Sequence, residues 1–483
     1  MTIDSYLATG ACLIDHRSGR RYDRTVVQNA VWDRARELGE ADARPGDLVV
    51  LAHGDGAALL VDLLAVWSCG AAAVVVSHGI TPEERAIVRD TTAPRAWIGH
   101  AAPDGVATLA PAQFVTNAAV PVRSVARLDD LALVMMTSGT TSRPKGVMLT
   151  HRAVQARLAL NIAHIGREDL AVALTVLPMH FGHGLIGNTL TALAAGARLV
   201  LWPEPGPTGL HALGHVVDEY GVTFMSSVPS LWRVALKLSQ PPKRGTLRRV
   251  HVGSAPLVAS LWTDIAAWSG TNRVVNMYGI TETANWIGGR SAEEGGLADG
   301  IVGRPWGGAF RVRLDDGSFA ALGRGEVAVN SPSLMAGYLN RPDLTDLSLS
   351  GDWFLTGDMG EIDGDGVLRL VGRSKHEINR GGIKIPAEEI DALLERHPGV
   401  VEACAFALHD PLSGETVAAA VVTEPHAAID TRAIRAWCET RIRREALPSR
   451  LFILDALPRT DRGKLNRDVV RDACISAGSG QPT

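Results

Sequence analysis

The sequence predicts an α/β protein, because short β-rich runs alternate with helical segments from about residue 48 onwards. A second observation supports parallel sheets: turns rich in Gly, Ser and Pro follow the predicted strands at their carboxyl ends, where open α/β sheets bind ligands. Glycine-punctuated short strands beyond residue 300 indicate a smaller β-rich section. We therefore predict a large N-terminal domain of parallel-rich sheets covered by helices, with a β-rich subdomain, followed by a small α+β C-terminal domain.

Length and composition limit the possible functions. A chain of 483 residues is too long for one compact core. With 46% hydrophobic residues, 21% charged residues and a net charge of −4, it has no excess of positive charge that would suggest a nucleic-acid partner. The N-terminus lacks a basic region followed by an apolar core, so we expect no export signal. Five cysteines without paired spacing indicate reduced thiols in a cytoplasm and no zinc site.

The predicted elements of the first part follow from apolar runs and helical periodicity. The most apolar stretch, residues 57–76, is interrupted by Asp62, Trp67 and Ser68, which favours a buried helix and strand over a membrane span. The predicted strands are residues 48–52, 72–76, 131–136, 173–176, 198–202, 223–225, 249–252 and 273–277, and two of the predicted helices are residues 151–165 and 210–220.

The second part of the chain contains shorter elements. Strands are predicted at residues 310–314, 326–330 and 367–371. A polar segment then begins at Gly372 and leads to Pro386, after which helices and strands resume. We place a domain junction near Lys375, which gives an N-terminal domain of residues 1–373 and a C-terminal domain of residues 374–483.

A loop after the strand at residues 131–136 is the most informative motif. Backbone N–H groups and hydroxyls of such a loop can wrap a polyphosphate, and a lysine adds a positive charge. It is not a Walker A loop, because Gly146 rather than Ser or Thr follows Lys145. A flexible polar loop is the alternative interpretation. The loop reads Thr137-Ser138-Gly139-Thr140-Thr141-Ser142-Arg143-Pro144-Lys145-Gly146.

Six further motifs follow in order, and together the seven resemble those of the adenylate-forming superfamily of acyl-CoA synthetases, peptide-synthetase adenylation domains and luciferases. The resemblance covers roughly residues 45 to 470. The six motifs are Leu177-Pro178-Met179-His180-Phe181-Gly182-His183-Gly184-Leu185, Asn276-Met277-Tyr278-Gly279-Ile280-Thr281-Glu282-Thr283, Gly325-Glu326-Val327 with Gly337-Tyr338-Leu339-Asn340, Thr356-Gly357-Asp358, Gly372-Arg373-Ser374-Lys375, and Pro458-Arg459-Thr460-Asp461-Arg462-Gly463-Lys464.

The resemblance implies a catalytic nucleotide site that uses ATP and Mg²⁺. Glu282 and Thr137 would hold Mg²⁺, which prefers oxygen ligands, and Asp358 would accept the ribose hydroxyls. Lys464 would be the catalytic cation that reaches the substrate carboxylate and the α-phosphate. The implied catalytic residues are Lys464, Glu282 and Thr137, and the implied ATP-binding residues are Thr137, Ser138, Gly139, Thr140, Thr141, Lys145, Gly253, Ser254, Ala255, Asn276, Met277, Tyr278, Gly279, Thr281, Asp358, Arg373 and Lys464.

Each of these residues has a simpler alternative. Taken alone, Glu282 could be a glutamate that the helix dipole favours at a helix start, and Asp358 a turn aspartate. Arg373 could form an interdomain ion pair instead of binding ribose or phosphate. A solvated surface lysine is the alternative for Lys464.

The resemblance also implies a small mobile C-terminal domain, which rotates about Lys375 between two half-reactions. Gly381 and Gly382 would then line the channel for the acceptor, although a plain hairpin turn explains them equally well. The predicted substrate pocket contains His180, Phe181, His183, Ser227 and Trp286. This mixture of aromatic and polar groups favours a compact aromatic or cyclic acid over a long fatty chain.

Three departures from the common family pattern concern the loop and the substrate. Ser142 replaces the usual glycine, and His180-Phe181 replaces the Phe-His order of many acyl-CoA synthetases. The segment between Met179 and Leu185 contains no aspartate, which argues against an α-amino acid substrate.

The predicted function is an AMP-forming acid–thiol ligase: it forms an acyl-adenylate with release of pyrophosphate, then transfers the acyl group to CoA. An alternative acceptor is a carrier-protein thiol or an amine. A third alternative is a nucleotide-binding protein without turnover. We expect no nucleic-acid or membrane partner, and either a monomer or a homodimer in the cytoplasm.

Overall fold

The structure is a computed structural model of the chain, and it describes residues 5–54, 56–99, 102–114, 120–137, 145–373, 376–380, 383–410, 414–424, 429–442, 444–459 and 465–478. The chain forms two compact units. The first comprises Met1–Phe310 with Val329–Leu355, and the second Arg311–Ala328 with Thr356–Thr483. The predicted fold class is confirmed: both sheets of the first unit are rich in parallel strands, and the second unit contains a smaller α+β section. The functional boundary between residues 373 and 374 stays a prediction.

The first sheet of unit one is mainly parallel and has the order β19-β8-β7-β4-β3-β5-β6. Its apolar runs are buried on both faces, as expected for strands covered by helices. The strands β7 and β8 form an antiparallel hairpin that places Thr137 opposite Lys145. The bounds are β3 Leu48–Ala52, β4 Ala72–Val75, β5 Ala96–Gly99, β6 Ala107–Leu109, β7 Leu131–Thr137, β8 Lys145–Thr150 and β19 Gly337–Tyr338.

The second sheet of unit one follows the order β2-β1-β10-β9-β11-β12-β13-β14-β15. Its central strands from β1 to β13 are parallel, so their carboxyl ends lie at one edge. The bounds are β1 Cys12–Asp15, β2 Arg21–Asp23, β9 Val172–Thr175, β10 Arg198–Leu201, β11 Phe224–Ser227, β12 Arg249–Val252, β13 Val274–Ile280, β14 Asn285–Ser291 and β15 Ile301–Pro305.

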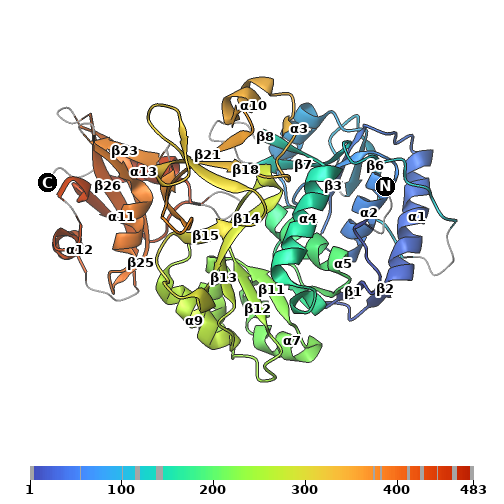
Figure 1. The fold of residues 1–483 in the computed structure, drawn as a ribbon, viewed down its shortest axis with the longest axis horizontal. Helices are drawn as coiled ribbons and strands as arrows, with labels where there is room; N and C mark the ends of the chain where they lie inside the picture. Colours follow the sequence, from blue (N-terminus) through green and yellow to red (C-terminus); the bar gives the residue numbers. More distant parts are fainter. Residues whose placement is uncertain are drawn as a thin grey trace. The chain divides into compact units, whose positions relative to one another are not determined.

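Helix α4, His151–Ile165, contacts strands of both sheets of unit one and has the bounds that the sequence predicts (Figure 1). It starts directly after β8 because the Thr150 side chain accepts a hydrogen bond from the backbone N–H of Ala153. The apolar stretch at residues 57–76 forms the buried helix α2, Ala57–Ser68, followed by β4, as predicted.

The other helices of unit one surround these sheets. The predicted helix at residues 210–220 is split in two, because α6 ends at Leu210 and α7 starts at Leu213. Helix η3 has π-helical hydrogen bonding and follows β9. The bounds are α1 Arg24–Glu40, α3 Pro82–Thr92, η2 Asp169–Ala171, η3 His183–Leu190, α5 Thr191–Ala195, α6 Gly206–Leu210, α7 Leu213–Tyr220, α8 Pro229–Leu238, α9 Ala259–Ser269, η4 Thr281–Thr283, η5 Ala292–Glu294 and α10 Pro342–Ser348.

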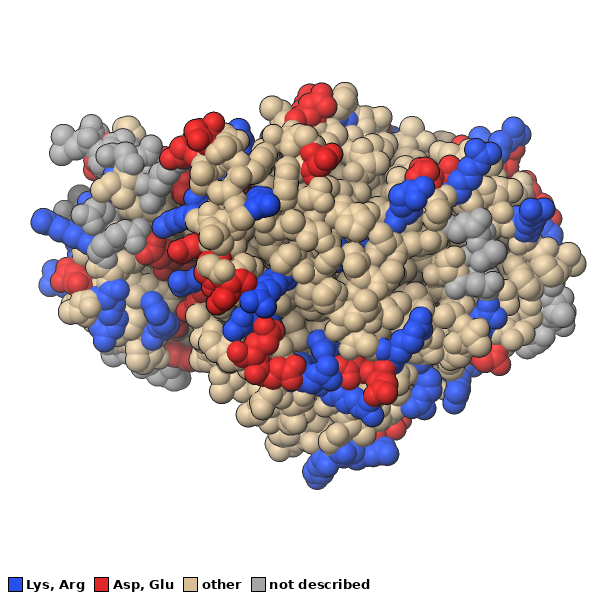
Figure 2. Space-filling view, viewed as in Figure 1, with Lys and Arg blue, Asp and Glu red and all other residues tan. Residues whose placement is uncertain are grey.

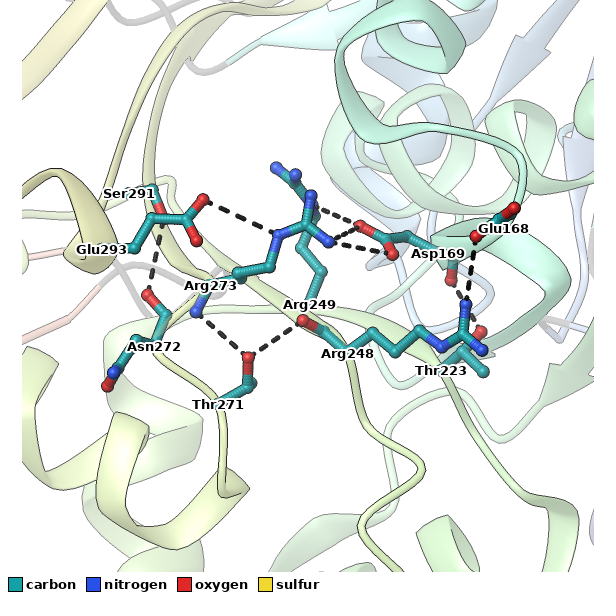
Figure 3. Close-up of polar contacts among 10 residues, drawn as sticks. All are labelled: Glu168, Asp169, Thr223, Arg248, Arg249, Thr271, Asn272, Arg273, Ser291 and Glu293. Carbon is teal, nitrogen blue, oxygen red and sulfur yellow. Dashed lines mark hydrogen bonds and ion pairs between the residues drawn. The ribbon is translucent and has the colours of Figure 1, made fainter.

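A buried ion network ties together the amino ends of the parallel strands (Figure 3). Asp169, just before β9, accepts from Arg249 Nε at 3.0 Å and forms an ion pair with Arg273 Nη1 at 2.9 Å. Thr223, just before β11, donates its hydroxyl to the carbonyl oxygen of Asp169 at 2.6 Å. Ion pairs thus link the starts of β9, β12 and β13, and the Thr223 hydroxyl links the start of β11 to them.

Unit two contains a β-rich section and an α+β section. In the α+β section the sheet order is β24-β23-β26-β25, with β27 beside β26, and helices α11, α12 and α13 pack with it. The bounds are β16 Ala309–Arg313, β17 Phe319–Ala320, β18 Gly323–Asn330, β21 Trp353–Ile362, β22 Leu368–Arg373, β23 Glu377–Arg380, β24 Ile383–Pro386, α11 Ala387–Leu394, β25 Val400–Asp410, β26 Gly414–Thr423, α12 Thr431–Glu439, η7 Arg444–Ala446, β27 Arg450–Ile453 and α13 Arg467–Gly478. The short strand β20, Leu349–Ser350, belongs to unit one. The division into units falls within β16, β18 and β21.

Acidic and basic side chains are intermixed on the visible face of the molecule (Figure 2). Among the described residues, no helix is both long enough and apolar enough to cross a bilayer.

Candidate active site

The phosphate-binding side of the predicted site begins at the hairpin of β7 and β8. Thr137 is the last residue of β7, and its hydroxyl donates to the carbonyl oxygen of Lys145 at 3.4 Å. The residues Ser138, Gly139, Thr140 and Thr141 lie outside the described residues. The described part of the motif therefore consists of its two ends, which face each other across the hairpin.

Glu282 lies directly after β13, and its carboxylate is oriented by a tyrosine. The Tyr338 hydroxyl donates to Glu282 Oε1 at 2.8 Å. Lys145 Nζ lies 4.8 Å from the centroid of the Tyr338 ring, a cation–π contact. Burial, together with the charge of Glu282, raises the pKa of Tyr338, so this phenol remains a hydrogen-bond donor at neutral pH. A half-buried carboxylate, a cation and hydroxyls thus meet beside the β7–β8 hairpin.

This arrangement fits a magnesium ion. Mg²⁺ in phosphate-transfer sites is held by one or two carboxylates together with substrate phosphates and water. Glu282 supplies one carboxylate, and a single oxygen of it is held by Tyr338. Among the described residues there is no group of three or more His, Cys, Asp or Glu side chains placed to hold a metal ion.

The predicted adenine-binding turns lie at the carboxyl ends of β12 and β13. Ser254 and Ala255 are exposed, and Ser254 has a left-handed backbone with φ of 66°. The neighbouring Gly253 packs so closely that a Cβ there would lie 3.1 Å from Cβ of Met277. Tyr278 is buried, with its ring centroid 6.0 Å from that of Phe310.

Other residues of the motif at residues 276–283 pack against, or bind to, the backbone of neighbouring segments. A Cβ on Gly279 would lie 2.5 Å from the carbonyl oxygen of Asn285, which explains the glycine. Asn276 is buried and donates through Nδ2 to the carbonyl oxygen of Ile301 at 2.7 Å. Its side chain is therefore used within the fold, whereas Thr281 is half-buried at the turn.

His183 joins the predicted acid pocket to the predicted adenine-binding turn. Its Nε2 atom is 2.6 Å from Ser226 Oγ, and its Nδ1 atom is 2.7 Å from Ser254 Oγ. Burial lowers the pKa of His183 to about 3, so the ring is neutral and donates through one nitrogen while it accepts through the other. A movement of Ser254 would therefore be transmitted to His183.

The other predicted pocket residues differ in how their polar atoms are used. The Ser227 hydroxyl donates to the carbonyl oxygen of His251 at 2.8 Å and accepts from Trp232 Nε1 at 2.7 Å. This hydroxyl is committed to the fold, and a role in substrate binding stays a prediction. His180 and Phe181 are half-buried, with ring centroids 4.1 Å apart.

Several buried polar atoms beside this pocket have no hydrogen-bond partner among the described residues. They are both ring nitrogens of His251, Nε1 of Trp286 and Nδ2 of Asn285. The ring centroids of His251 and Trp286 lie 4.7 Å apart, and a Cβ on Gly187 would lie 1.9 Å from Asn285 Nδ2 and 3.0 Å from the Trp286 ring. Buried polar atoms are nearly always paired. The Asn285 amide and the Trp286 ring therefore pack closely against Gly187, and their unpaired N–H groups are candidate donors to water or to an oxygen of a ligand.

In unit two, Asp358 lies opposite Arg373 in the register of β21 and β22. Asp358 is buried, and its backbone N–H donates to the hydroxyl of Thr356 at 3.1 Å. Two residues predicted to bind the ribose or a phosphate are therefore cross-strand neighbours. The predicted residues Lys375, Gly381, Gly382 and Lys464 lie outside the described residues, and their roles stay predictions.

Sequence reasoning missed the polar residues that serve the predicted ones. Tyr338 lies in a quoted motif and Ser226 in one of the turns after the predicted strands, but the sequence assigns neither a specific role, and it does not single out His251 or Asn285. The alternation of a strand places Ser226 and Ser227 on opposite faces, but the sequence does not show which face contacts His183.

Comparisons with known proteins decide the family. The model of the AMP-binding enzyme family matches residues 12–339, and that of the AMP-binding enzyme C-terminal domain matches residues 389–464. The chain is an AMP-binding enzyme. The resemblance that the seven motifs indicate is thereby confirmed.

Several relatives of this AMP-binding enzyme are named acid–CoA ligases, and another is a dimodular nonribosomal peptide synthase of Bacillus subtilis. The chain is 31% identical over 473 residues to an oxalate–CoA ligase of Arabidopsis thaliana, a match that covers 90% of each chain. It is 35% identical over 347 residues to a sulfoacetate–CoA ligase of Cupriavidus necator, which covers 70% of this chain and 66% of the relative. A 2-succinylbenzoate–CoA ligase of Geobacillus kaustophilus is 28% identical over 466 residues, 94% of this chain and 93% of the relative.

A solved structure confirms the fold of the AMP-binding enzyme. ATP-bound MatB from Rhodopseudomonas palustris has a TM-score of 0.86 at 24% identity, with 96% of each chain covered. At that identity the likeness concerns the fold alone.

Proposed function

We propose that this AMP-binding enzyme is an ATP-dependent acid–CoA ligase that forms AMP and pyrophosphate. The observation that carries the proposal is the group formed by Glu282, Tyr338 and Lys145 beside the β7–β8 hairpin, in a chain with several relatives that are named CoA ligases. ATP, Mg²⁺ and CoA are the cofactors and co-substrate of this family of ligases.

In the first step, a carboxylate oxygen of the acid forms a bond to the α-phosphorus of ATP, and the bond from that phosphorus to the pyrophosphate oxygen breaks. Negative charge is spread over phosphate oxygens, so the protein contributes mainly position and positive charge. Glu282 and Thr137 would hold the magnesium ion, which neutralises phosphate charge when bound. Lys145 adds a second cation near Tyr338.

In the second step, the thiolate sulfur of CoA forms a bond to the acyl carbon, and AMP leaves with the electron pair of the broken carbon–oxygen bond. We propose Asp358 and Arg373 as the ribose- and phosphate-binding pair, which their cross-strand pairing in unit two supports. Lys464 as the catalytic cation, Lys375 as the hinge between residues 1–373 and 374–483, and Gly381 with Gly382 as the acceptor channel complete the proposal.

Within the small carboxylic acids, we propose a compact acid that carries a second oxygen-bearing group. The unpaired N–H donors of Asn285 and Trp286 support such a group, because a bound oxygen would give them an acceptor. The relatives are named for oxalate, sulfoacetate and 2-succinylbenzoate, and each of these acids has a second oxygen-rich group. The Trp286 and Phe181 rings support an aromatic or cyclic member of this class.

The proposed compartment is the cytoplasm, which the five free cysteines support. Transfer to a carrier-protein thiol or to an amine remains the alternative second step, and the oligomeric state stays a prediction.

Product analysis tests this proposal. The enzyme is supplied with ATP, Mg²⁺ and a panel of acids, with CoA, with an amine, or with neither. We expect acid-dependent release of pyrophosphate, an acyl-CoA product, and 2-succinylbenzoate or another compact di-acid ahead of benzoate and of long-chain acids. An amide as the only product would show that an amine, and not CoA, is the acceptor. A preference for long-chain acids would overturn the proposed substrate class.

A further inference from the structure

Arg157, in the middle of α4, is a fully buried arginine. Its relative exposure is 0%, and burial lowers the pKa of its guanidinium to about 9. No carboxylate pairs with it among the described residues. Because an unpaired buried cation is costly, such a residue needs another reason to be retained.

The guanidinium of Arg157 binds two serines and one carbonyl group instead. Its Nε and Nη2 atoms donate to Ser333 Oγ at 3.1 and 2.6 Å, and Nη2 also donates to Ser331 Oγ at 3.0 Å. Nη1 donates to the carbonyl oxygen of Trp306 at 3.2 Å. All three nitrogens of the side chain therefore donate to groups of the protein itself.

Ser333 transmits this interaction to the turn that carries Glu282. The Ser333 hydroxyl donates to the carbonyl oxygen of Thr283 at 2.8 Å, while its lone pairs accept from Arg157. A hydroxyl that accepts a hydrogen bond from a cation is polarised. The hydrogen bond that the Ser333 hydroxyl donates to Thr283 is therefore strengthened. The backbone N–H of Met335 holds the other side of the turn by donating to the carbonyl oxygen of Glu282 at 2.7 Å.

The turn itself adopts a conformation that its residues do not favour. Ala284 has a φ of 54° and Asn285 a φ of 97°, although neither residue is glycine. Such backbone costs free energy and persists only where surrounding contacts enforce it. The hydrogen bonds from Ser333 and Met335 are contacts of this kind, and they act on the residues next to Glu282.

We propose that Arg157 is a positioning residue, which acts through Ser333 to hold the turn of residues 282–285 so that the Glu282 carboxylate faces the magnesium–phosphate site. The inference rests on the proposed function, since it takes Glu282 as the magnesium-binding carboxylate. It assigns to a buried cation, far along the chain from this motif, an effect on how the enzyme responds to Mg²⁺.

Two serine variants separate positioning from simple stabilisation. Ser333→Ala removes an acceptor of Arg157 and also the bond to Thr283. Ser331→Ala is the control: it removes one acceptor of Arg157 together with the contacts of Ser331 Oγ to the hydroxyl and backbone N–H of Ser333, at 3.0 and 3.3 Å, but it leaves the bond from Ser333 to Thr283 in place. Arg157→Lys and Arg157→Met extend the test where they fold.

The measurement is the affinity for ATP by titration calorimetry over a series of Mg²⁺ concentrations, with the melting temperature recorded for each protein. The quantity compared is the Mg²⁺ concentration that gives half of the maximal increase in ATP affinity. We expect this concentration to be about tenfold higher for Ser333→Ala than for wild type, as for other residues that orient a metal ligand. For Ser331→Ala we expect a change of less than about threefold.

Equal Mg²⁺ dependence in Ser333→Ala and wild type would overturn the inference, as would equal shifts in the two serine variants. A lower melting temperature of Ser333→Ala with wild-type Mg²⁺ dependence would likewise reduce Arg157 to a structural role. If the wild-type enzyme itself shows no Mg²⁺-dependent binding of ATP, the proposed function fails, and this result is visible before any variant is compared.

Discussion

The two edges of the second sheet of unit one are built from different kinds of polar residues. At the amino edge, Asp169 pairs with Arg249 and Arg273, and the three side chains satisfy one another (Figure 3). At the carboxyl edge, His183 is neutral, and His251 has ring nitrogens without partners among the described residues. The buried polar groups at the amino edge are charged and paired, whereas the buried histidines at the carboxyl edge are uncharged and incompletely paired.

This difference separates stability from function within one sheet. A paired network holds strands in place, and it offers nothing to a ligand. Unpaired buried donors cost stability, and they are retained where a ligand supplies the missing acceptor. The carboxyl edge is also where open α/β sheets bind ligands. Variants at the amino edge should therefore change stability, and those at the carboxyl edge should change binding.

The largest expected effect is at the amino edge. Asp169→Asn leaves the Arg249 guanidinium, which is 9% exposed, without a charged partner. Loss of one member of a buried ion pair costs about 3–5 kcal/mol, so we expect the free energy of unfolding to fall by that amount. Urea denaturation measures it, and activity per folded molecule should stay at the wild-type level.

Glu168→Gln is the control for this variant. Its carboxylate is 94% exposed and lies 3.7 Å from Arg248, so its loss should cost less than about 1 kcal/mol. Equal destabilisation by the two variants would mean that the buried network does not hold the amino edge.

A smaller effect, on pH dependence, is expected at the carboxyl edge. The pKa of His183 is about 3 in the folded protein, below the value of about 6.5 in the unfolded chain. Between these values the unfolded chain binds the additional proton, so the free energy of unfolding should decrease as pH falls below about 6.5. Each such histidine contributes a slope of at most about 1.4 kcal/mol per pH unit.

His183→Gln removes this contribution and keeps a side chain that can donate and accept. Urea denaturation of both proteins between pH 7.5 and 4.5 should give a shallower slope for the variant. His151, with a pKa lowered to about 4 by burial, and His251, whose pKa burial also lowers, leave part of the slope in place. Identical slopes would show that His183 does not remain neutral in the folded protein.

The smallest effect concerns a single N–H group. Trp286→Phe removes an indole N–H that has no partner among the described residues, so the apo-enzyme should lose only the packing of the missing ring atoms, a loss that Trp232→Phe shares. Trp232→Phe removes an N–H that Ser227 accepts, and it should lower the free energy of unfolding by about 1–2 kcal/mol.

Substrate selectivity should change more in Trp286→Phe than in Trp232→Phe, which is the reverse of their order in stability. Trp286→Phe should lose about fivefold to tenfold of the preference for a di-acid over the matching mono-acid, in competition assays of pyrophosphate release, because one hydrogen bond is worth about 1 kcal/mol. An unchanged preference would exclude Trp286 as a donor to the acid.

Much of the fold could be predicted from sequence, because strand and helix periodicity is local. The bounds of β3, β12 and α4 are those predicted, and the fold class is confirmed. The helix predicted at residues 210–220 is interrupted, since Leu210 ends α6 and α7 begins only at Leu213. The motifs also gave Glu282 and His183 as candidates before their surroundings were known.

The partners of these residues could not be predicted, because they come from distant parts of the chain. Tyr338 reaches Glu282 across 56 residues of sequence, and Arg157 reaches Ser333 across 176. In the sequence, nothing about an arginine in a helix of mixed composition shows that its side chain is buried or that it has no carboxylate partner. Only the packing of α4 between strands of both sheets brings it to Ser333.

The central claim is that the carboxyl edge of this sheet, with Glu282 at the end of β13, is where the acid and ATP react. Acid-dependent exchange of pyrophosphate into ATP tests it most directly, with wild type, Glu282→Gln and Glu168→Gln compared at equal concentrations of folded protein. We predict a loss of at least about 100-fold for Glu282→Gln, the scale for removing a charged group that stabilises the transition state, and less than about twofold for Glu168→Gln at the opposite edge. Exchange by Glu282→Gln within about threefold of wild type would contradict the account.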